Sequence, residues 1–135
     1  LLGATVRHTG AGLVCVDLPY CRGALWPAGV HPMVHLHMAH RAFALVVLGL
    51  SIGSALRLRR SESRLVRALA WAGPLLVGVQ IALGVSTILT FKDLVPLTAH
   101  LMVGALLMMD QVALLAVTRR APAAESAPAA LGVAA

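Results

Sequence analysis

Three histidines and an arginine lie close together in the segment HLHMAHR, residues 35–41, which leads directly into a long apolar run. Residues 42–56 carry no charge, so together with part of the preceding segment they are long enough to cross a bilayer as a helix. Polar residues inside a span are costly and indicate function by default, because they face the bundle interior and need a partner. The first question is therefore which group His40 faces.

A second histidine, His100, is expected at a similar depth on another span. His40 lies eight residues past Pro32, roughly 12 Å along a helix, and His100 lies four residues past Pro96, roughly 6 Å. Two neutral imidazoles on bundled helices can hold a haem iron between them. The alternative is that His100 hydrogen-bonds a neighbouring helix and that nearby glycines only tighten the packing. Spacing alone leaves both interpretations open.

Arg41 and Arg7 are candidate partners for haem propionates, because guanidinium groups pair with carboxylates. The alternative for Arg41 is that its side chain extends outward to the membrane surface. Asp110, roughly 15 Å below His100 along the same span, is expected to reach the arginines at the other membrane face. The five methionines are interpreted as packing residues rather than ligands.

Cys15 and Cys21 are separated by five residues in a loop that contains several glycines and prolines. On the outer, oxidising side of a membrane such a pair is expected to form a disulfide or a redox-active dithiol. Two alternatives stay open. One is an inert buried thiol pair, and the other is a zinc site completed by His31 or His35, although the spacing matches no compact zinc pattern.

Three apolar spans, at about 32–56, 68–90 and 96–118, are predicted to position these residues. Hydrophobic residues make up 59% of the chain and charged residues 12%, against roughly 25% charged in soluble domains. We therefore predict an all-α membrane protein, a transmembrane helical bundle with lipid around it. The net charge of +6 does not indicate nucleic acid, because the arginines cluster at the ends of apolar runs and aromatic residues are few.

Four segments are predicted along the chain. Residues 1–6 are the end of a truncated first span, residues 7–31 an outer loop with the cysteine pair, residues 32–118 the haem-binding bundle, and residues 119–135 a disordered tail. The sequence begins in mid-pattern without an initiator methionine. We therefore expect a fragment, or one half, of a longer protein.

Arginine asymmetry predicts the orientation of the bundle. Residues 57–67 contain five arginines and the tail begins with two more, whereas the 91–95 turn has one lysine balanced by Asp93. Because basic loops stay in the cytoplasm, the 57–67 loop and the C-terminus are predicted inside and the cysteine loop outside. The predicted location is a plasma membrane of the bacterial type.

Several motifs together resemble the heme A synthase family. They are VRHTGAGLVCVDLPYCRG from residue 6, HMAHR ending at Arg41, QIALGVSTIL from Gln80, and AHL around His100. That family is built from two similar four-helix halves, each holding a haem between histidines of its second and fourth helices. The resemblance implies that the three spans are helices two to four of one half. It also implies that His40 and His100 are the axial iron ligands, and that Cys15 and Cys21 are the family's outer-loop cysteine pair.

The same resemblance implies an activity and its partners. The family oxidises a ring methyl of haem O to a formyl group, which gives haem A, and one half carries a haem b. The implied partners are a second four-helix half or another copy of the chain, a haem O synthase and an electron donor. No nucleic acid is expected.

One position departs from the family pattern. A catalytic half commonly has glutamate three residues before the first histidine, where this chain has His37. This favours a haem b half, or a branch in which a different residue, with His37 as the candidate, is catalytic. Two other functions stay open: a non-catalytic membrane cytochrome whose bis-histidine haem passes electrons, and a helical membrane protein without a cofactor.

Overall fold

The computed structural model describes residues 2–120. A short helix α1 (Leu2–His8) and a 3₁₀ turn η1 (Ala11–Leu13) precede three long helices, which are α2 (Pro32–Leu58), α3 (Arg64–Leu89) and α4 (Leu94–Arg120). Each long helix has the length and apolar composition needed to cross a membrane. The predicted all-α fold with three candidate spans is confirmed.

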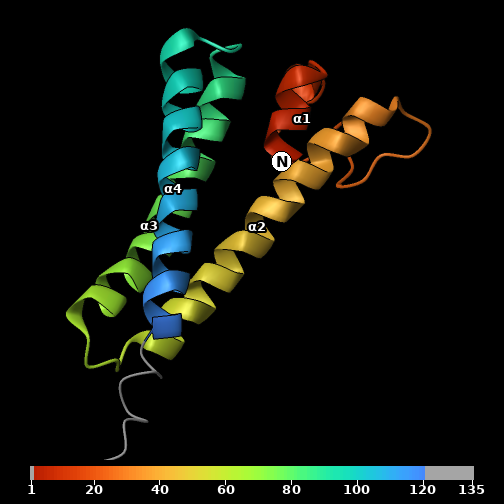
Figure 1. The fold of residues 1–135 in the computed structure, drawn as a ribbon. Coiled ribbons are helices and arrows are strands. Elements are labelled where there is room, and N and C mark those ends of the chain that lie inside the picture. The colour runs from red at the N-terminus through yellow and green to blue at the C-terminus, as the bar shows by residue number, and fades with distance from the viewer. Residues whose placement is uncertain (1, 121–135) are drawn as a thin grey trace, which may run out of the picture.

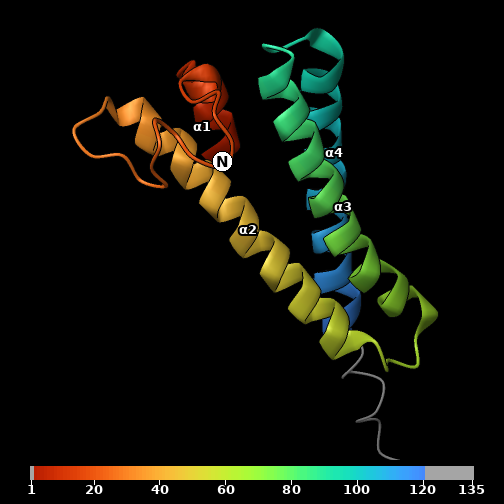
Figure 2. The same ribbon diagram turned by 180° about the vertical axis from the view of Figure 1, so that it is seen from behind.

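The three long helices meet at one end and diverge at the other (Figures 1 and 2). Helices α3 and α4 lie side by side, whereas α2 crosses them obliquely and approaches them toward its C-terminal end, and α1 lies beside the N-terminal half of α2. Gly73 of α3 allows the close approach, because a Cβ there would come within 2.8 Å of Gln111 Nε2 on α4 and would also touch Ser51 Cβ of α2 at 3.6 Å. Small and polar side chains therefore fill the point where α2, α3 and α4 meet.

Each long helix begins where a side chain accepts a hydrogen bond from its first turn. His31 Nδ1 accepts from a backbone N–H of α2 at 3.3 Å. Pro32 is the first residue of the helix, where a backbone N–H would have no acceptor within the helix, so proline loses no hydrogen bond there. Ser63 caps α3 at 3.4 Å, and Asp93 Oδ1 accepts from a backbone N–H of α4 at 2.9 Å. These caps set the short connections at 59–63 and 90–93.

The helices extend past the predicted boundaries of the spans. Arg57 lies in the last turn of α2 and Arg64 begins α3, so only residues 59–63 of the predicted basic loop connect the two helices. Helix α1 ends at His8, inside the predicted outer loop, and α4 continues through the first two residues of the predicted tail. Residue 1 and the rest of the predicted tail, 121–135, lie outside the described residues.

Candidate functional site

His40 lies on the face of α2 that meets α1. A Cβ on Gly3 of α1 would lie 3.2 Å from His40 Cε1, so a larger residue would have to displace the ring. The Nδ1 atom of His40 is buried and has no hydrogen-bond partner within residues 2–120. His40 and His100 both lie within the first three turns of their helices, α2 and α4. We call this end of the bundle, where α2 and α4 begin and α3 ends, the histidine end.

Two atoms of Gln80 on α3 contact the imidazole of His100 on α4. Its Nδ1 lies 3.0 Å from the backbone oxygen of Gln80, and its Nε2 lies 3.3 Å from the side-chain nitrogen of the same residue. Because a carbonyl oxygen only accepts, the proton is on Nδ1 and Nε2 presents a lone pair. The interhelical hydrogen bond that the alternative requires is present. The ligand role of His100 stays a prediction, and this tautomer is also the one that ligates a metal through Nε2.

These two histidines fit a haem better than a protein-only metal centre. No group of three His, Cys, Asp or Glu side chains that could hold a metal ion occurs in the part of the chain that the structure describes. Two neutral imidazoles on different helices suit a haem iron, whose remaining ligands come from the porphyrin. The unpartnered Nδ1 of His40 and the Nδ1–H tautomer of His100 are consistent with that arrangement.

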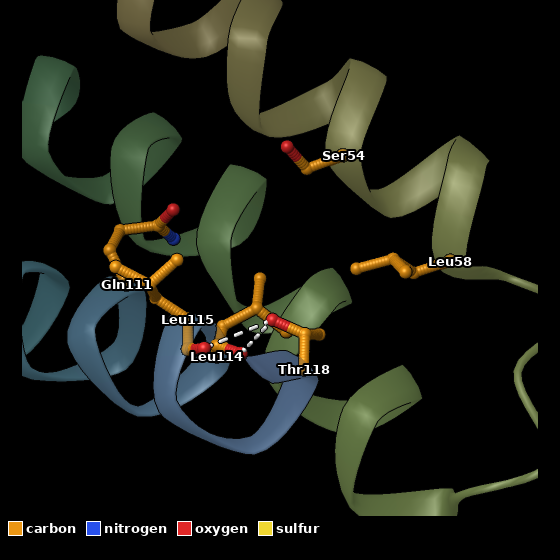
Figure 3. A pocket seen from close by; sticks show the side chains of 6 residues that line it. All are labelled: Ser54, Leu58, Gln111, Leu114, Leu115 and Thr118. Atoms are coloured by element: carbon orange, nitrogen blue, oxygen red, sulfur yellow. Dashed lines mark hydrogen bonds between the residues drawn. The ribbon is translucent and has the colours of Figure 1, made fainter. Parts of the chain in front are cut away.

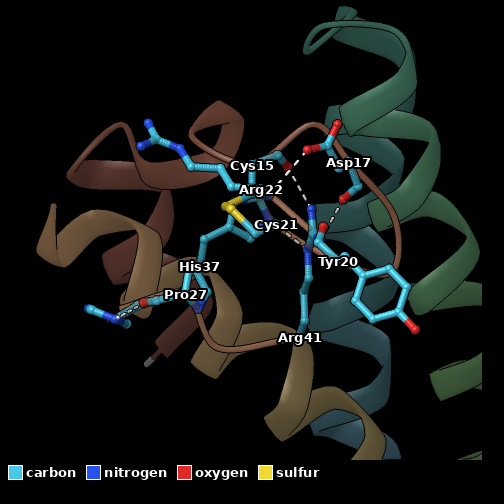
Figure 4. Close-up of a disulfide and its surroundings, with 9 residues drawn as sticks. Cys15, Asp17, Tyr20, Cys21, Arg22, Pro27, His37 and Arg41 are labelled. Atoms are coloured by element: carbon cyan, nitrogen blue, oxygen red, sulfur yellow. Dashed lines mark hydrogen bonds between the residues drawn. A yellow bond between two sulfur atoms is a disulfide. The ribbon is translucent and has the colours of Figure 1, made fainter. Parts of the chain in front are cut away.

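Cys15 and Cys21 form a disulfide above the histidine end (Figure 4). The two residues are only 2% and 1% exposed, and they pack against Val34 and Met38 of α2. The predicted disulfide is confirmed. The alternative zinc site is wrong because a disulfide offers no thiolate ligand. Burial of both sulfur atoms also hinders thiol exchange, which requires access to the attacked sulfur.

The two histidines considered for zinc have other partners. His31 caps α2, and His35 Nε2 lies 2.8 Å from the backbone oxygen of Pro27. The His35 ring also stacks on Trp26, with ring centroids 5.0 Å apart. His35 therefore fixes the end of the cysteine loop to the first turns of α2.

Arg41 ties the disulfide loop to α2 (Figure 4). Its Nη1 donates to the backbone oxygens of Asp17 at 2.8 Å and Tyr20 at 3.4 Å, and its Nη2 donates to the Cys15 oxygen at 2.6 Å. Three carbonyl groups of one loop thus converge on one guanidinium, whose donors have a fixed forked arrangement. Arg41 is engaged with backbone in this structure, and its predicted contact with a haem propionate stays a prediction.

His37 and Arg7 occupy contrasting positions at the histidine end. His37 is 3% exposed beneath the disulfide loop, and its Nε2 accepts from Arg41 Nε at 3.3 Å. Arg7 lies in the last turn of α1 and is exposed. The predicted catalytic role of His37 and propionate contact of Arg7 both stay predictions.

Two residues of this region had no role assigned from the sequence. Gln80 could have been found, because an amide within a membrane span needs a hydrogen-bond partner. Lys92 could not, because its place depends on a turn in which Phe91 and Lys92 have φ values of 50° and 67°. That turn directs the lysine toward the loop after α1, where a Cβ on Gly12 would lie 3.1 Å from Lys92 Cε.

The other end of the bundle has its own polar group and pocket. Asp110 is buried, and its hydrogen-bond partner among residues 2–120 is Gln111, at 2.9 Å, rather than one of the arginines that were expected. A pocket of about 340 Å³ opens between α2 and α4 (Figure 3). It is lined by Ser54, Leu58, Gln111, Leu114, Leu115 and Thr118. These residues lie far along both helices from His40 and His100, so the pocket is separate from the histidine site.

Comparison with known proteins gives a family and several relatives. The family model COX15-CtaA, described as a cytochrome oxidase assembly protein, matches residues 1–112. A heme A synthase of Halalkalibacterium halodurans is 34% identical over 108 residues, which cover 78% of this chain and 36% of the relative. A heme A synthase of Symbiobacterium thermophilum is 37% identical over 101 residues, which cover 73% of this chain and 32% of the relative. The chain thus spans about a third of the length of these relatives. No solved structure matches it.

Proposed function

This chain belongs to the COX15-CtaA family of cytochrome oxidase assembly proteins, and from that premise we propose that it is a haem-binding part of a heme A synthase. In this proposal His40 and His100 hold a haem b, and the complete protein oxidises a ring methyl of haem O to the formyl group of haem A. The observation that carries the proposal is the placement of both imidazoles at the histidine end, with His100 fixed in the Nδ1–H tautomer. The bound haem supplies an iron that exchanges single electrons.

The other residues of the histidine end position and cover this site. Gly3 and Gly84 leave room beside the two imidazole rings, since a Cβ at either position would lie 3.2 Å from a ring carbon. Arg41 holds the disulfide loop over the beginning of α2 through three backbone oxygens. A covered site limits the access of water to the haem, and this raises the strength of electrostatic interactions within it.

The surroundings of His37 support a haem b part rather than the part that binds the substrate haem. Its Nε2 is engaged by Arg41, so in this proposal His37 helps to position Arg41. The same observation favours a second candidate function, a membrane cytochrome that only passes electrons. Both candidates require the His40 and His100 haem, and they differ in whether haem A is made.

Haem retention by variants tests the site. We expect His40→Ala and His100→Ala to lose most of the haem absorbance per molecule of protein purified in lipid, because each removes one axial ligand. Membrane insertion should persist, since alanine adds no charge to a span. His8→Ala is the matched control, because His8 is exposed at the end of α1. Unchanged haem content in both test variants would overturn the assignment.

Pigment analysis separates the two candidate functions. The chain and a complementing heme A synthase half are expressed separately and together in membranes that contain haem O, and haems are extracted from all three preparations. Haem A that forms only when this chain is present supports the synthase. Haem b that is retained by this chain, with no haem A even when the two are expressed together, supports the electron-passing cytochrome.

A further inference from the structure

Gln80 makes two different contacts with one imidazole, and each has its own consequence. We propose that Gln80 is a positioning residue for His100: its backbone oxygen selects the tautomer, and its side-chain amide competes with the haem iron for the Nε2 lone pair. This inference rests on the proposed haem site. The role belongs to a residue of α3, whereas the two proposed iron ligands lie on α2 and α4.

The backbone contact fixes which nitrogen is protonated. The Gln80 oxygen, 3.0 Å from His100 Nδ1, belongs to a helix interior, where a carbonyl already accepts from the residue four positions later. That residue is Gly84, and the absence of a side chain lets the ring approach. A Cβ at Gly84 would lie 3.2 Å from His100 Cε1 and 3.6 Å from Nδ1. The glycine therefore opens the path by which His100 reaches the carbonyl.

The side-chain contact occupies the other nitrogen. Since Nε2 of His100 carries a lone pair, the atom 3.3 Å away must be the donor, which identifies it as the amide nitrogen of Gln80. The amide oxygen is then buried without a partner within residues 2–120. A buried acceptor without a hydrogen bond is unfavourable. The amide nitrogen of Gln80 therefore reaches His100 only in an arrangement that leaves the amide oxygen without a hydrogen bond.

A second glycine holds the amide in this position. A Cβ on Gly104 of α4 would lie 3.0 Å from the Gln80 side-chain nitrogen. The pair formed by Gln80 and His100 is thus enclosed by Gly84 on one helix and Gly104 on the other. The contact between Gln80 and His100 is therefore part of the packing of α3 against α4 and does not lie at the surface.

The two contacts respond differently to a bound iron. One lone pair cannot accept a hydrogen bond and coordinate iron at the same time, so ligation through Nε2 requires the Gln80 amide to move away. The Nδ1–H bond to the backbone oxygen does not change, and a donor–acceptor pair of this kind orients a metal-bound imidazole. Replacing only the side chain should therefore free Nε2 and leave the tautomer intact.

Haem titration tests the competition. We expect Gln80→Leu, in lipid nanodiscs, to bind haem about two- to tenfold more tightly than the parent chain, the range that corresponds to one net hydrogen bond. Gln111→Leu is the matched control, because it makes the same replacement on α4 next to Asp110, away from His100. Equal or weaker haem binding by Gln80→Leu would overturn the competition, provided that the parent binds haem. A parent chain that binds no haem would overturn the proposed function itself.

The imidazole nitrogens give a readout that does not depend on haem. With ¹⁵N-labelled histidine, we expect the parent chain without haem to show His100 protonated on Nδ1 with a hydrogen-bonded Nε2. In Gln80→Leu the Nδ1 proton should remain, while the Nε2 resonance moves to the position of a free lone pair. A merely space-filling role for Gln80 would leave that resonance unchanged. Protonation of His100 on Nε2 in the parent would also overturn the inference.

Discussion

Arg41 Nη2 lies 2.6 Å from the backbone oxygen of Cys15, which joins the span that carries His40 to the disulfide loop. The same guanidinium holds two further oxygens of the loop through Nη1. Because Arg41 directly follows His40 in the chain, the position of the loop and the position of the proposed haem ligand are mechanically linked. The disulfide therefore influences the histidine end through backbone carbonyls rather than through its sulfur atoms.

Arg41→Ala should lower the free energy of unfolding by about 1–3 kcal/mol, because it removes charge-assisted hydrogen bonds to three loop carbonyls, of which the contact with the Cys15 oxygen is partly buried. Arg41→Lys should recover only part of this loss, since an ammonium group cannot reproduce the forked contacts. Thermal melting of the purified variants measures both effects. Arg59→Ala, at an exposed arginine after α2, is the control. Identical melting of Arg41→Ala and the parent would show that these contacts contribute nothing.

Removal of the disulfide should affect haem binding more than stability. The cysteines are six positions apart, so the bond constrains the unfolded chain by only about 2 kcal/mol. We expect Cys15→Ala with Cys21→Ala to lose stability by no more than about this amount. The variant should also retain less haem per folded molecule, because the carbonyls that hold Arg41 lose their fixed spacing. Alanine avoids placing hydroxyl groups in a buried site. A large stability loss with normal haem content would instead identify the disulfide as a purely structural cross-link.

The parts of the fold that depend on local sequence were predictable. Apolar length and composition indicated three spans, Pro32 marked the beginning of α2, and the spacing of Cys15 and Cys21 indicated the disulfide. These features follow from the cost of exposing backbone in lipid and from local chain geometry. The helix ends were less predictable, because Arg57 and Arg64 lie within helices although their charge is typical of a loop.

Contacts that depend on how the helices pack could not be predicted from the sequence. The partner of His100 is Gln80, twenty positions earlier, and the contact requires a particular alignment of α3 against α4. Arg41 was expected near a propionate or the membrane surface, but backbone oxygens of a folded loop surround it. No residue type in that loop signals the contact, because every residue has a carbonyl.

The orientation of the bundle can be tested with single added cysteines. Ala28→Cys places a thiol in the exposed cysteine loop, and Glu62→Cys places one in the exposed turn between α2 and α3. The native cysteines will not react while they form a disulfide. If the arginines lie in the cytoplasm, a membrane-impermeant maleimide added to intact cells should label Ala28→Cys and should label Glu62→Cys only after lysis. The reverse pattern would invert the predicted orientation.

Two glycines of α3 should respond oppositely to the same substitution. A methyl group at Gly84 would lie 3.2 Å from His100 Cε1, whereas a methyl group at Gly78 would meet no atom within 4 Å. Gly78→Ala should therefore leave haem binding unchanged and stabilise the helix by up to about 1 kcal/mol, because alanine favours helices. Gly84→Ala should displace the imidazole from the Gln80 carbonyl and weaken haem binding about tenfold, the effect of a modest overpacking penalty. Haem titration and thermal melting of the two variants, side by side, measure these effects. Equal haem affinity in both would show that the close contact between Gly84 and His100 does not position the ligand.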